Sequence, residues 1–353
     1  MKALVFSESA KSALKIVQKP AINKSEMLLK VKACAICGTD IKLDRGSSTK
    51  LTKHGIKNMT FPRITGHEFA GVIEETGSDV TGFKSGERVN VSPVIPCMDC
   101  RFCRAGHKEM CDNKIIIGFD IDGGFAEYVR IPEIAIRSGC VHRMADDTGF
   151  EEATFVEPLA VVLNSQEITG VKPQDSILII GAGPVGLLQI QAARNTGVSK
   201  IMVADISEER LNFAGKFGAG LLIDNKTDNL VGRVTRETNG DGVDVVLICA
   251  SAKALFSESL KLAAKLGRIN YFAGLSKNDS NVEIDANLVH YNELSITGTS
   301  DSTPEQNRRA MEMINSKKID AKSLITHRFS LEKYYDGLEI ARQGKAIKVV
   351  INF

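Results

Sequence analysis

The chain has 353 residues, of which 43% are hydrophobic and 25% are charged, with a formal net charge of +2. This length suits two domains of ordinary size. The balanced charge gives no electrostatic basis for binding nucleic acid or an acidic membrane surface. No stretch approaches the ~20 apolar residues of a membrane span, and the first residues lack the apolar segment of a secretory signal. We therefore expect a cytoplasmic protein with no nucleic-acid or membrane partner.

The N-terminal part predicts a mainly β domain. Short strand-like segments at 27–34, 69–77 and 88–93 alternate with glycine-rich turns. Cysteine residues are concentrated here, and four of the eight lie between Cys97 and Cys111. Such spacing in a chain without secretory features indicates metal ligands rather than disulfides.

From about residue 160 onward, strands and helices alternate. The predicted strands are 176–183, 200–205, 243–250 and 267–274. One helix follows the first strand to about Asn195, and another begins after the N-cap Ser207 and ends at Gly218 or Gly220. A further helical stripe is formed by Phe256, Leu260, Ala263 and Ala264. Continuous apolar strands alternating with helices predict a doubly wound α/β domain with a parallel sheet.

The first strand-to-helix turn of this domain carries a glycine motif, G-x-G-x-x-G. Its residues with an expected role in cofactor binding are Gly181, Gly183, Pro184, Val185 and Gly186. The glycines allow a tight turn and the close approach of a pyrophosphate to the backbone, and the helix N-terminus adds partial positive charge. A merely glycine-rich turn is the alternative. The position between a strand and a helix favours dinucleotide binding.

Asp205 ends the second strand, about 20 residues beyond the motif, where a carboxylate accepts hydrogen bonds from the adenosine ribose. Its charge would repel a 2′-phosphate, and the next two residues are not arginine. The nearest basic side chain that could contact the cofactor, Arg210, lies one helical turn further on. The sequence therefore predicts NAD rather than NADP.

A cysteine cluster predicts a structural zinc site in a lobe at about 92–115. Its four members are Cys97, Cys100, Cys103 and Cys111. Four thiolates close a tetrahedral zinc site and leave no open position. The alternative, an iron–sulfur cluster, normally has its fourth cysteine after three residues and followed by proline, which this chain does not have. His107 is interpreted as a solvated loop residue, because four cysteines already suffice.

A second, incomplete set of metal ligands is spread along the chain. Cys37, His67, Glu68 and Glu157 are a thiolate, an imidazole and two carboxylates from separate segments. Three such ligands leave a position of zinc open for water or substrate, which is typical of a catalytic site. Cys37 and Glu157 neutralise Zn²⁺, and Glu68 is an optional ligand that competes with water. Each residue alone is also compatible with a purely structural role.

The order and spacing of these motifs resemble those of the zinc-dependent medium-chain dehydrogenases over nearly the whole chain. The motifs that carry the resemblance are 37–40 (Cys-Gly-Thr-Asp), 66–68 (Gly-His-Glu), the four-cysteine lobe, 157–160 (Glu-Pro-Leu-Ala) and 181–186. Glutamate at 157 is similar to the polyol (sorbitol or iditol) and threonine dehydrogenase branch. The resemblance implies a GroES-like catalytic domain at 1–158 and 300–353, a Rossmann NAD-binding domain at 159–299, and a homotetramer or dimer.

In such an enzyme, one zinc per chain acts as a Lewis acid on an alcohol substrate and hydride passes to NAD, while a second zinc is structural. The resemblance makes Thr39 the start of a proton relay, although a threonine that only bonds its own turn is the alternative. Many relatives have histidine three residues later, where this chain has Lys42. Lysine is a poor proton acceptor at neutral pH, so we expect direct proton release to water.

The substrate stays open at this stage. Residues 118–128 resemble threonine dehydrogenases, whereas 157–164 resemble polyol enzymes. The sequence favours oxidation of a secondary alcohol of a polyol or sugar alcohol to the ketone, with threonine or 2,3-butanediol as alternatives. Basic residues between Lys42 and Lys57 are usually solvated surface, but they would also suit a phosphorylated polyol. Phe119 and the loop 44–60 are expected to shape the pocket. Outside this class, a catalytically silent zinc and NAD-binding protein and an iron–sulfur carrier remain as alternatives.

Overall fold

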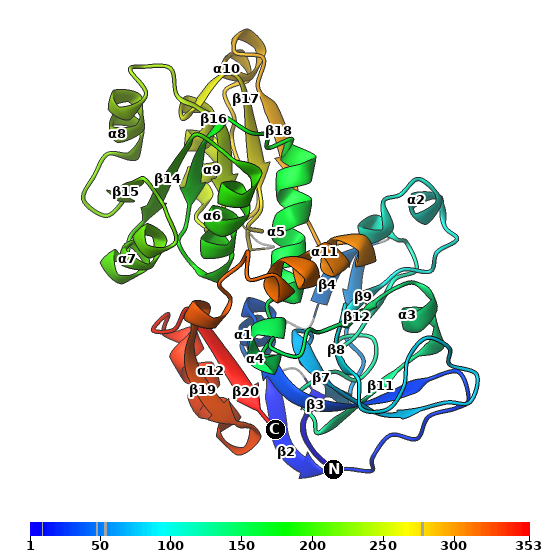
Figure 1. The fold of residues 1–353 in the computed structure, drawn as a ribbon. Helices are drawn as coiled ribbons and strands as arrows, with labels where there is room; N and C mark the ends of the chain where they lie inside the picture. Colours follow the sequence, from blue (N-terminus) through cyan, green and yellow to red (C-terminus); the bar gives the residue numbers. More distant parts are fainter. Residues whose placement is uncertain (9, 47–48, 53–54, 277–278) are drawn as a thin grey trace. The chain divides into compact units, whose positions relative to one another are not determined.

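The computed structural model describes residues 1–8, 10–46, 49–52, 55–276 and 279–353 (Figure 1). The chain divides into two compact units, 1–160 with 301–353, and 161–300. Lys53 and His54 of the predicted basic run lie outside the described residues. Among the described residues, no helix is long and apolar enough to cross a membrane.

The first unit is built on antiparallel sheets. Its main sheet has the order β12-β8-β7-β3-β20-β19, and β11 also pairs with β3. The bounds are β3 (Met27–Ala35), β7 (Phe69–Thr76), β8 (Arg88–Val91), β11 (Tyr128–Ile131), β12 (Val141–Arg143), β19 (Ile325–Ser330) and β20 (Lys348–Asn352). Smaller sheets join β1 (Lys2–Glu8), β2 (Lys11–Ile16) and β6 (Arg63–Ile64), then β9 (Val94–Ile95) and β10 (Ile115–Ile116), and β4 (Thr49–Thr52) and β5 (Gly55–Asn58).

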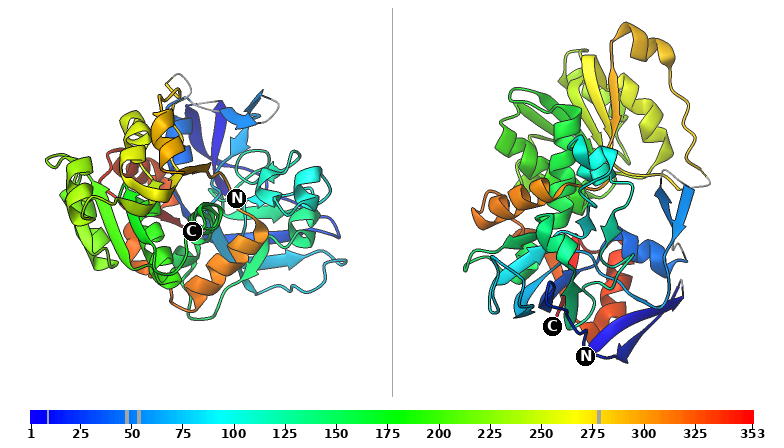
Figure 2. Two further views of the ribbon diagram at one scale, coloured as in Figure 1. Left: turned by 90° about the horizontal axis from the view of Figure 1, so that it is seen from above. Right: turned by 90° about the vertical axis from the view of Figure 1, so that its right-hand side faces the viewer.

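The two ends of the sequence meet in this sheet. The C-terminal strand β20 pairs antiparallel with β3, with Val350 opposite Ala35 and Ile351 opposite Cys34 (Figures 1 and 2). The strand β20 is almost wholly buried because it lies between β3 and β19. The last residues of the chain are thus part of the core of the N-terminal unit, which places the side chains of β20 beside those at the end of β3.

Short helices connect the strands of the first unit. They are α1 (Gly38–Asp44), α2 (Arg101–Arg104), α3 (Glu133–Arg137), α4 (Phe150–Ala153), α11 (Pro304–Asn315) and α12 (Tyr334–Arg342), together with the start of α5 (Val156–Thr169). Helix α11 packs on β12 and α4, and α12 packs on β19 and β20. Helix α11 begins with Thr303 as N-cap, Pro304 in the first turn and a reciprocal bond with Gln306, as expected for a strong helix start.

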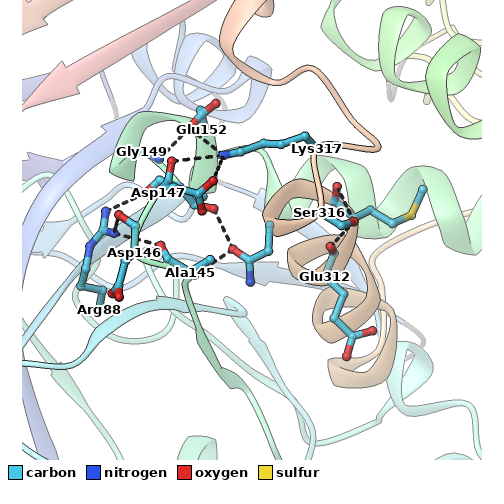
Figure 3. Close-up of polar contacts among 12 residues, drawn as sticks. Arg88, Ala145, Asp146, Asp147, Gly149, Glu152, Glu312, Ser316 and Lys317 are labelled. Carbon is cyan, nitrogen blue, oxygen red and sulfur yellow. Dashed lines mark hydrogen bonds and ion pairs between the residues drawn. The ribbon is translucent and has the colours of Figure 1, made fainter.

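The loop that leads into α4 and α5 is held by side chains from two distant segments (Figure 3). Arg88 donates to the carbonyl oxygens of Ala145 (2.9 Å) and Asp146 (2.5 Å). Lys317 donates to the carbonyl oxygen of Asp147 (3.1 Å), and its ammonium lies 3.9 Å from a carboxylate oxygen of Glu152. A cavity of about 940 Å³ opens at this loop, but its lining contains none of the predicted site residues.

The second unit is a parallel sheet with the order β15-β14-β13-β16-β17-β18. Its strands are β13 (Ser176–Ile180), β14 (Lys200–Asp205), β15 (Leu221–Asp224), β16 (Val243–Ile248), β17 (Ala263–Tyr271) and β18 (Ser295–Gly298). Helices alternate with them: α6 (Pro184–Thr196), α7 (Glu208–Lys216), α8 (Leu230–Glu237), α9 (Lys253–Glu258) and α10 (Ala286–Tyr291). The apolar residues of β13 and β16 are buried, which explains their unbroken hydrophobic runs. The predicted doubly wound α/β fold is confirmed.

Several predicted boundaries differ from the structure. Ala263 and Ala264 were expected in a helical stripe, but α9 and the following 3₁₀ turn end at Lys261. Both alanines instead begin β17, because Ala263 pairs with Val243 of the neighbouring strand. Sheet hydrogen bonds therefore outweigh the local helical periodicity. The strands predicted as 176–183, 243–250 and 267–274 also end earlier, at Ile180, Ile248 and Tyr271.

A buried histidine in the first unit gives the protein a specific acid sensitivity. Nε2 of His142, on β12, lies 2.7 Å from Oγ of Ser92, and both side chains are buried. Burial, assisted by Arg308, lowers the pKa of His142 to about 4. In the unfolded chain the pKa is about 6.5, so the unfolded chain binds a proton that the folded chain does not. The stability due to neutral His142 is therefore complete above pH 6.5 and is lost as the pH falls towards 4.

We expect His142→Gln to reduce the loss of stability between pH 7 and pH 4.5 relative to the unchanged protein. The difference between the two pKa values corresponds to at most about 3 kcal/mol. Thermal unfolding at both pH values measures it. Equal pH dependence in the two proteins would show that His142 does not report this acid step.

Candidate active site and metal centres

Three of the predicted catalytic ligands meet at the end of β3. Cys37 is the N-cap of α1, and His67 and Glu68 directly precede β7. One ligand atom from each of these three residues lies within 4.8 Å of those of the other two. The backbone explains the convergence, because the N–H of Ala35 at the end of β3 donates to the carbonyl oxygen of Glu68 (2.9 Å).

Gly66 allows His67 to approach this point. Its φ is +92°, and an added Cβ would lie 2.7 Å from the backbone nitrogen of Phe125 and 2.8 Å from Sγ of Cys34. Any side chain at 66 would therefore collide with the core as well as adopt an unfavourable backbone conformation. The glycine before the histidine is a geometric requirement of the site.

Glu157 lies in the first turn of α5, also beside His67 and Glu68. Burial raises the pKa of Glu157 to about 7, with His67 opposing the rise and Glu68 adding to it. Glu157 is outside the group of three whose ligand atoms lie within 4.8 Å of one another. The geometry thus brings Cys37, His67 and Glu68 together and places Glu157 next to them, as a fourth candidate ligand.

The site is strongly negative, which suits a divalent cation. Burial disfavours a charged imidazole, yet Cys37, Asp40 and Glu157 outweigh it and hold the pKa of His67 well above its usual value. A thiolate, an imidazole and carboxylates are ligands that zinc prefers. The residues present therefore fit a zinc ion with fewer than four obligatory protein ligands.

Two further residues of this site were not predicted from the sequence as functional. Asp40 is buried and accepts a hydrogen bond from the backbone N–H of Cys37 (2.8 Å), which fixes the start of α1. Lys348, from β20, is buried and forms an ion pair with Glu68. Burial opposes its charge, but Glu68 and Cys37 outweigh this and raise the pKa of Lys348. A capping position three residues after Cys37 signals Asp40, whereas nothing local signals Lys348.

Thr39 and Lys42 lie in α1. Both side chains are exposed, and Oγ1 of Thr39 lies 3.9 Å from Sγ of Cys37. This distance places the threonine hydroxyl beside the candidate metal site, where the relay role needs it. The side chains of Lys50 and Lys57 are outside what the structure describes.

The four-cysteine lobe has the geometry of a closed metal site. The ligand atoms of Cys97, Cys100, Cys103 and Cys111 all lie within 4.8 Å of one another. Sγ of Cys100 lies 3.6 Å from that of Cys103 and 3.8 Å from that of Cys111. A tetrahedron with zinc–sulfur distances of ~2.3 Å has sulfur–sulfur distances of ~3.8 Å. The residues therefore fit a structural zinc ion.

Backbone N–H groups also favour thiolates in this lobe. The backbone N–H of Cys97 donates to Sγ of Cys111 (3.2 Å), and that of Cys100 donates to Sγ of Cys97 (3.4 Å). A backbone hydrogen bond from Cys103 contributes most to lowering the pKa of Cys100 to about 6. His107 has a side chain that is 67% exposed and lies 3.3 Å from Glu109, which agrees with its interpretation as a solvated loop residue.

In the second unit, the predicted glycine turn joins β13 to α6. Gly181 has φ +105°, Gly183 is the N-cap of α6, and Pro184 occupies its first turn. A Cβ at Gly186 would lie 1.9 Å from the carbonyl oxygen of Gly181, so only glycine lets the helix start this close to the strand. The turn has the local geometry of a pyrophosphate-binding loop at a helix N-terminus.

Asp205 connects this turn to the end of β14. Its two carboxylate oxygens accept hydrogen bonds from the backbone N–H groups of Ala182 (2.6 Å) and Ser207 (2.9 Å). The carboxylate therefore lies at the glycine turn, at the position expected for a ribose acceptor. Arg210 follows in α7, whose N-cap is Ser207. These positions agree with the sequence-based expectation of a dinucleotide site.

We expect Asp205→Ala to weaken NAD binding and to reduce the preference for NAD over NADP. The carboxylate both accepts ribose hydrogen bonds and repels a 2′-phosphate, and its removal ends both effects. The ratio of kcat/KM with NAD to that with NADP measures this. Asp205→Asn keeps one acceptor oxygen for the turn and serves as the structural control. An unchanged ratio in both variants would place the ribose elsewhere.

Comparison with known proteins identifies the family. The alcohol dehydrogenase GroES-like domain matches residues 23–138, and the zinc-binding dehydrogenase domain matches residues 184–316. L-threonine 3-dehydrogenase of Bacillus licheniformis is 33% identical, over 99% of this chain and 98% of its own. Sorbitol dehydrogenase of Bacillus subtilis is 31% identical, over 99% and 97%. A structure from Sinorhizobium meliloti, assigned as a zinc-binding dehydrogenase and bound to NADP, has a TM-score of 0.91 at 29% identity and covers 100% of this chain and 99% of its own.

The chain therefore belongs to the zinc-binding alcohol dehydrogenase family and is an oxidoreductase. The predicted fold class and enzyme class are confirmed, as are zinc and a nicotinamide dinucleotide as the cofactors of the family. The choice of NAD, the role of each site residue and the substrate stay predictions.

Proposed function

We propose that this chain oxidises a secondary alcohol of a polyol or sugar alcohol to the ketone, with NAD as hydride acceptor. The convergence of Cys37, His67 and Glu68, with Glu157 beside them, is the observation that carries this proposal. It provides a metal site whose protein ligands need not fill all coordination positions. The dinucleotide turn at Gly181 and Asp205 supplies the place for the second substrate.

The residues divide the work as follows. Cys37, His67 and one carboxylate, Glu157 or Glu68, would hold zinc, which when bound lowers the pKa of the substrate hydroxyl and orients it for hydride loss to the nicotinamide. Thr39, beside Cys37, accepts the hydroxyl proton and passes it to solvent. Asp40 keeps Cys37 in position through its backbone N–H. We propose a homotetramer, or a dimer, as the working assembly.

Threonine is the second candidate substrate. Its hydroxyl is also a secondary alcohol, and residues 118–128 resemble those of threonine dehydrogenases. The 33% identity to an L-threonine 3-dehydrogenase over nearly the full length supports it, while the relative at 31% identity is a sorbitol dehydrogenase. 2,3-Butanediol and phosphorylated polyols follow as further members of the same reaction class.

A substrate panel tests the proposal. Sorbitol and other polyols, their phosphates, L-threonine and 2,3-butanediol are assayed with NAD and with NADP at alkaline pH, following absorbance of the reduced cofactor. We expect NAD-linked oxidation to be fastest with a polyol. Highest kcat/KM with threonine would select the second candidate. NAD binding without reduction by any alcohol, in protein with full zinc content, would favour the catalytically silent alternative.

A further inference from the structure

A lysine lies at the back of the candidate catalytic site. Lys348 and Glu68 form an ion pair in which the side chains are only 5% and 1% exposed. Removing two charges from water is costly, and a single unpaired charge left in their place is costlier still. The pair is therefore committed, since neither group has water to turn to. One of its members, Glu68, is also a candidate metal ligand.

The backbone holds the two partners close together. Lys348 begins β20, which pairs with β3 through Val350 and Ala35. The N–H of Ala35 in turn donates to the carbonyl oxygen of Glu68 (2.9 Å). Both residues are thus fixed to the same end of β3. The ring of Phe155 lies 5.8 Å from the ammonium of Lys348 and covers part of its environment.

The charges of the site balance only when Lys348 is counted. A thiolate at Cys37 and a carboxylate at Glu157 offset the two charges of Zn²⁺, and His67 is neutral as a ligand. The carboxylate of Glu68 then leaves one negative charge, and the ammonium of Lys348 removes it. With Lys348 present, Glu68 can stay ionised without bonding to the metal.

We propose that Lys348 is a positioning residue that holds the Glu68 carboxylate away from the metal and so keeps a coordination position open for the substrate oxygen. This inference rests on the proposed function. Without Lys348, the buried carboxylate of Glu68 has the metal as its nearest remaining cation and becomes an additional ligand. It then competes with the alcohol, which reduces the fraction of protein able to bind substrate.

Cobalt(II) in place of zinc makes this coordination visible. Four-coordinate cobalt absorbs more strongly in the visible region than five- or six-coordinate cobalt, and the Cys37→Ser protein serves as the blank for the four-cysteine lobe. We expect Lys348→Met to lose d–d band intensity, and to lose about 10–100-fold in kcat/KM, as is usual for residues that support metal ligands. The loss should lie mainly in KM, because the new ligand competes with substrate.

Three matched variants complete the test. Lys348→Arg keeps the charge and should retain the original spectrum. In Lys348→Met/Glu68→Gln, the competing carboxylate is gone, so the four-coordinate spectrum should return and KM should fall towards its original value. An unchanged spectrum in Lys348→Met would overturn the inference. If that variant does not fold, the double variant and Glu68→Gln alone must have the same spectrum, and a difference between them would overturn it.

The same experiment separates this inference from the proposed function. The cobalt spectra decide whether Lys348 controls coordination, whichever alcohol is used. A protein that shows the expected spectral changes but oxidises none of the panel would retain the coordination role and lose the proposed reaction. A protein that oxidises the panel but shows no spectral change in Lys348→Met would retain the reaction and lose the inference.

Discussion

Glu157→Ala is expected to lose one zinc ion per chain and most of the activity while the protein remains folded. Glu157 is the carboxylate that, together with Cys37, neutralises the metal in the proposed site, and its neighbours leave it buried beside His67. Removing it leaves Cys37, His67 and a Glu68 already engaged by Lys348. Elemental analysis of zinc, circular dichroism and kcat/KM on the preferred substrate measure the three expected outcomes.

Two control variants identify which carboxylate binds the metal. Glu167→Ala removes an exposed carboxylate from the same helix α5 and should keep both zinc ions and full activity. Glu68→Ala should keep both zinc ions if Glu157 is the ligand. Retention of both ions and full rate in Glu157→Ala, with loss of an ion in Glu68→Ala, would exchange the two roles. That outcome would also remove the basis for the role of Lys348.

Cys100→Ser is expected to have its largest effect on stability rather than on the hydride step. A closed four-thiolate site contacts no substrate, and structural zinc contributes about 10–16 kcal/mol of apparent binding energy in zinc-finger peptides. We expect one zinc ion fewer per chain and a markedly lower melting temperature, with kcat of the remaining folded protein largely preserved. Cys249→Ser, outside the lobe, is the control for loss of a thiol and should keep both ions.

The lobe also supports residues beyond itself. Lys108 forms an ion pair with Glu305 at the start of α11, and Lys114 forms one with Asp301. Loss of the zinc should therefore loosen the segment 301–305 as well, measurable as faster amide hydrogen exchange there. Unchanged melting temperature together with two zinc ions in Cys100→Ser would show that the four cysteines do not form the structural site.

Local features of the sequence were read correctly where one segment carries all the information. The glycine turn needs only the residues 181–186 and a strand before it, because steric limits on the backbone act between near neighbours. The four cysteines lie within one short lobe, so their spacing alone predicted a common site. Local periodicity was misleading only where sheet pairing intervened, as at Ala263.

The sequence by itself determined the doubly wound domain, the cysteine cluster, the dinucleotide turn and the types of ligand available for a catalytic metal. Only the tertiary structure decided which of those ligands meet, since Cys37, His67 and Glu68 come from segments that β3 and β7 bring together. It also added Lys348, whose role depends on β20 pairing with β3 at the opposite end of the chain. A buried charge is defined by its partner, and partners that are distant in sequence become visible only when the sheet is formed.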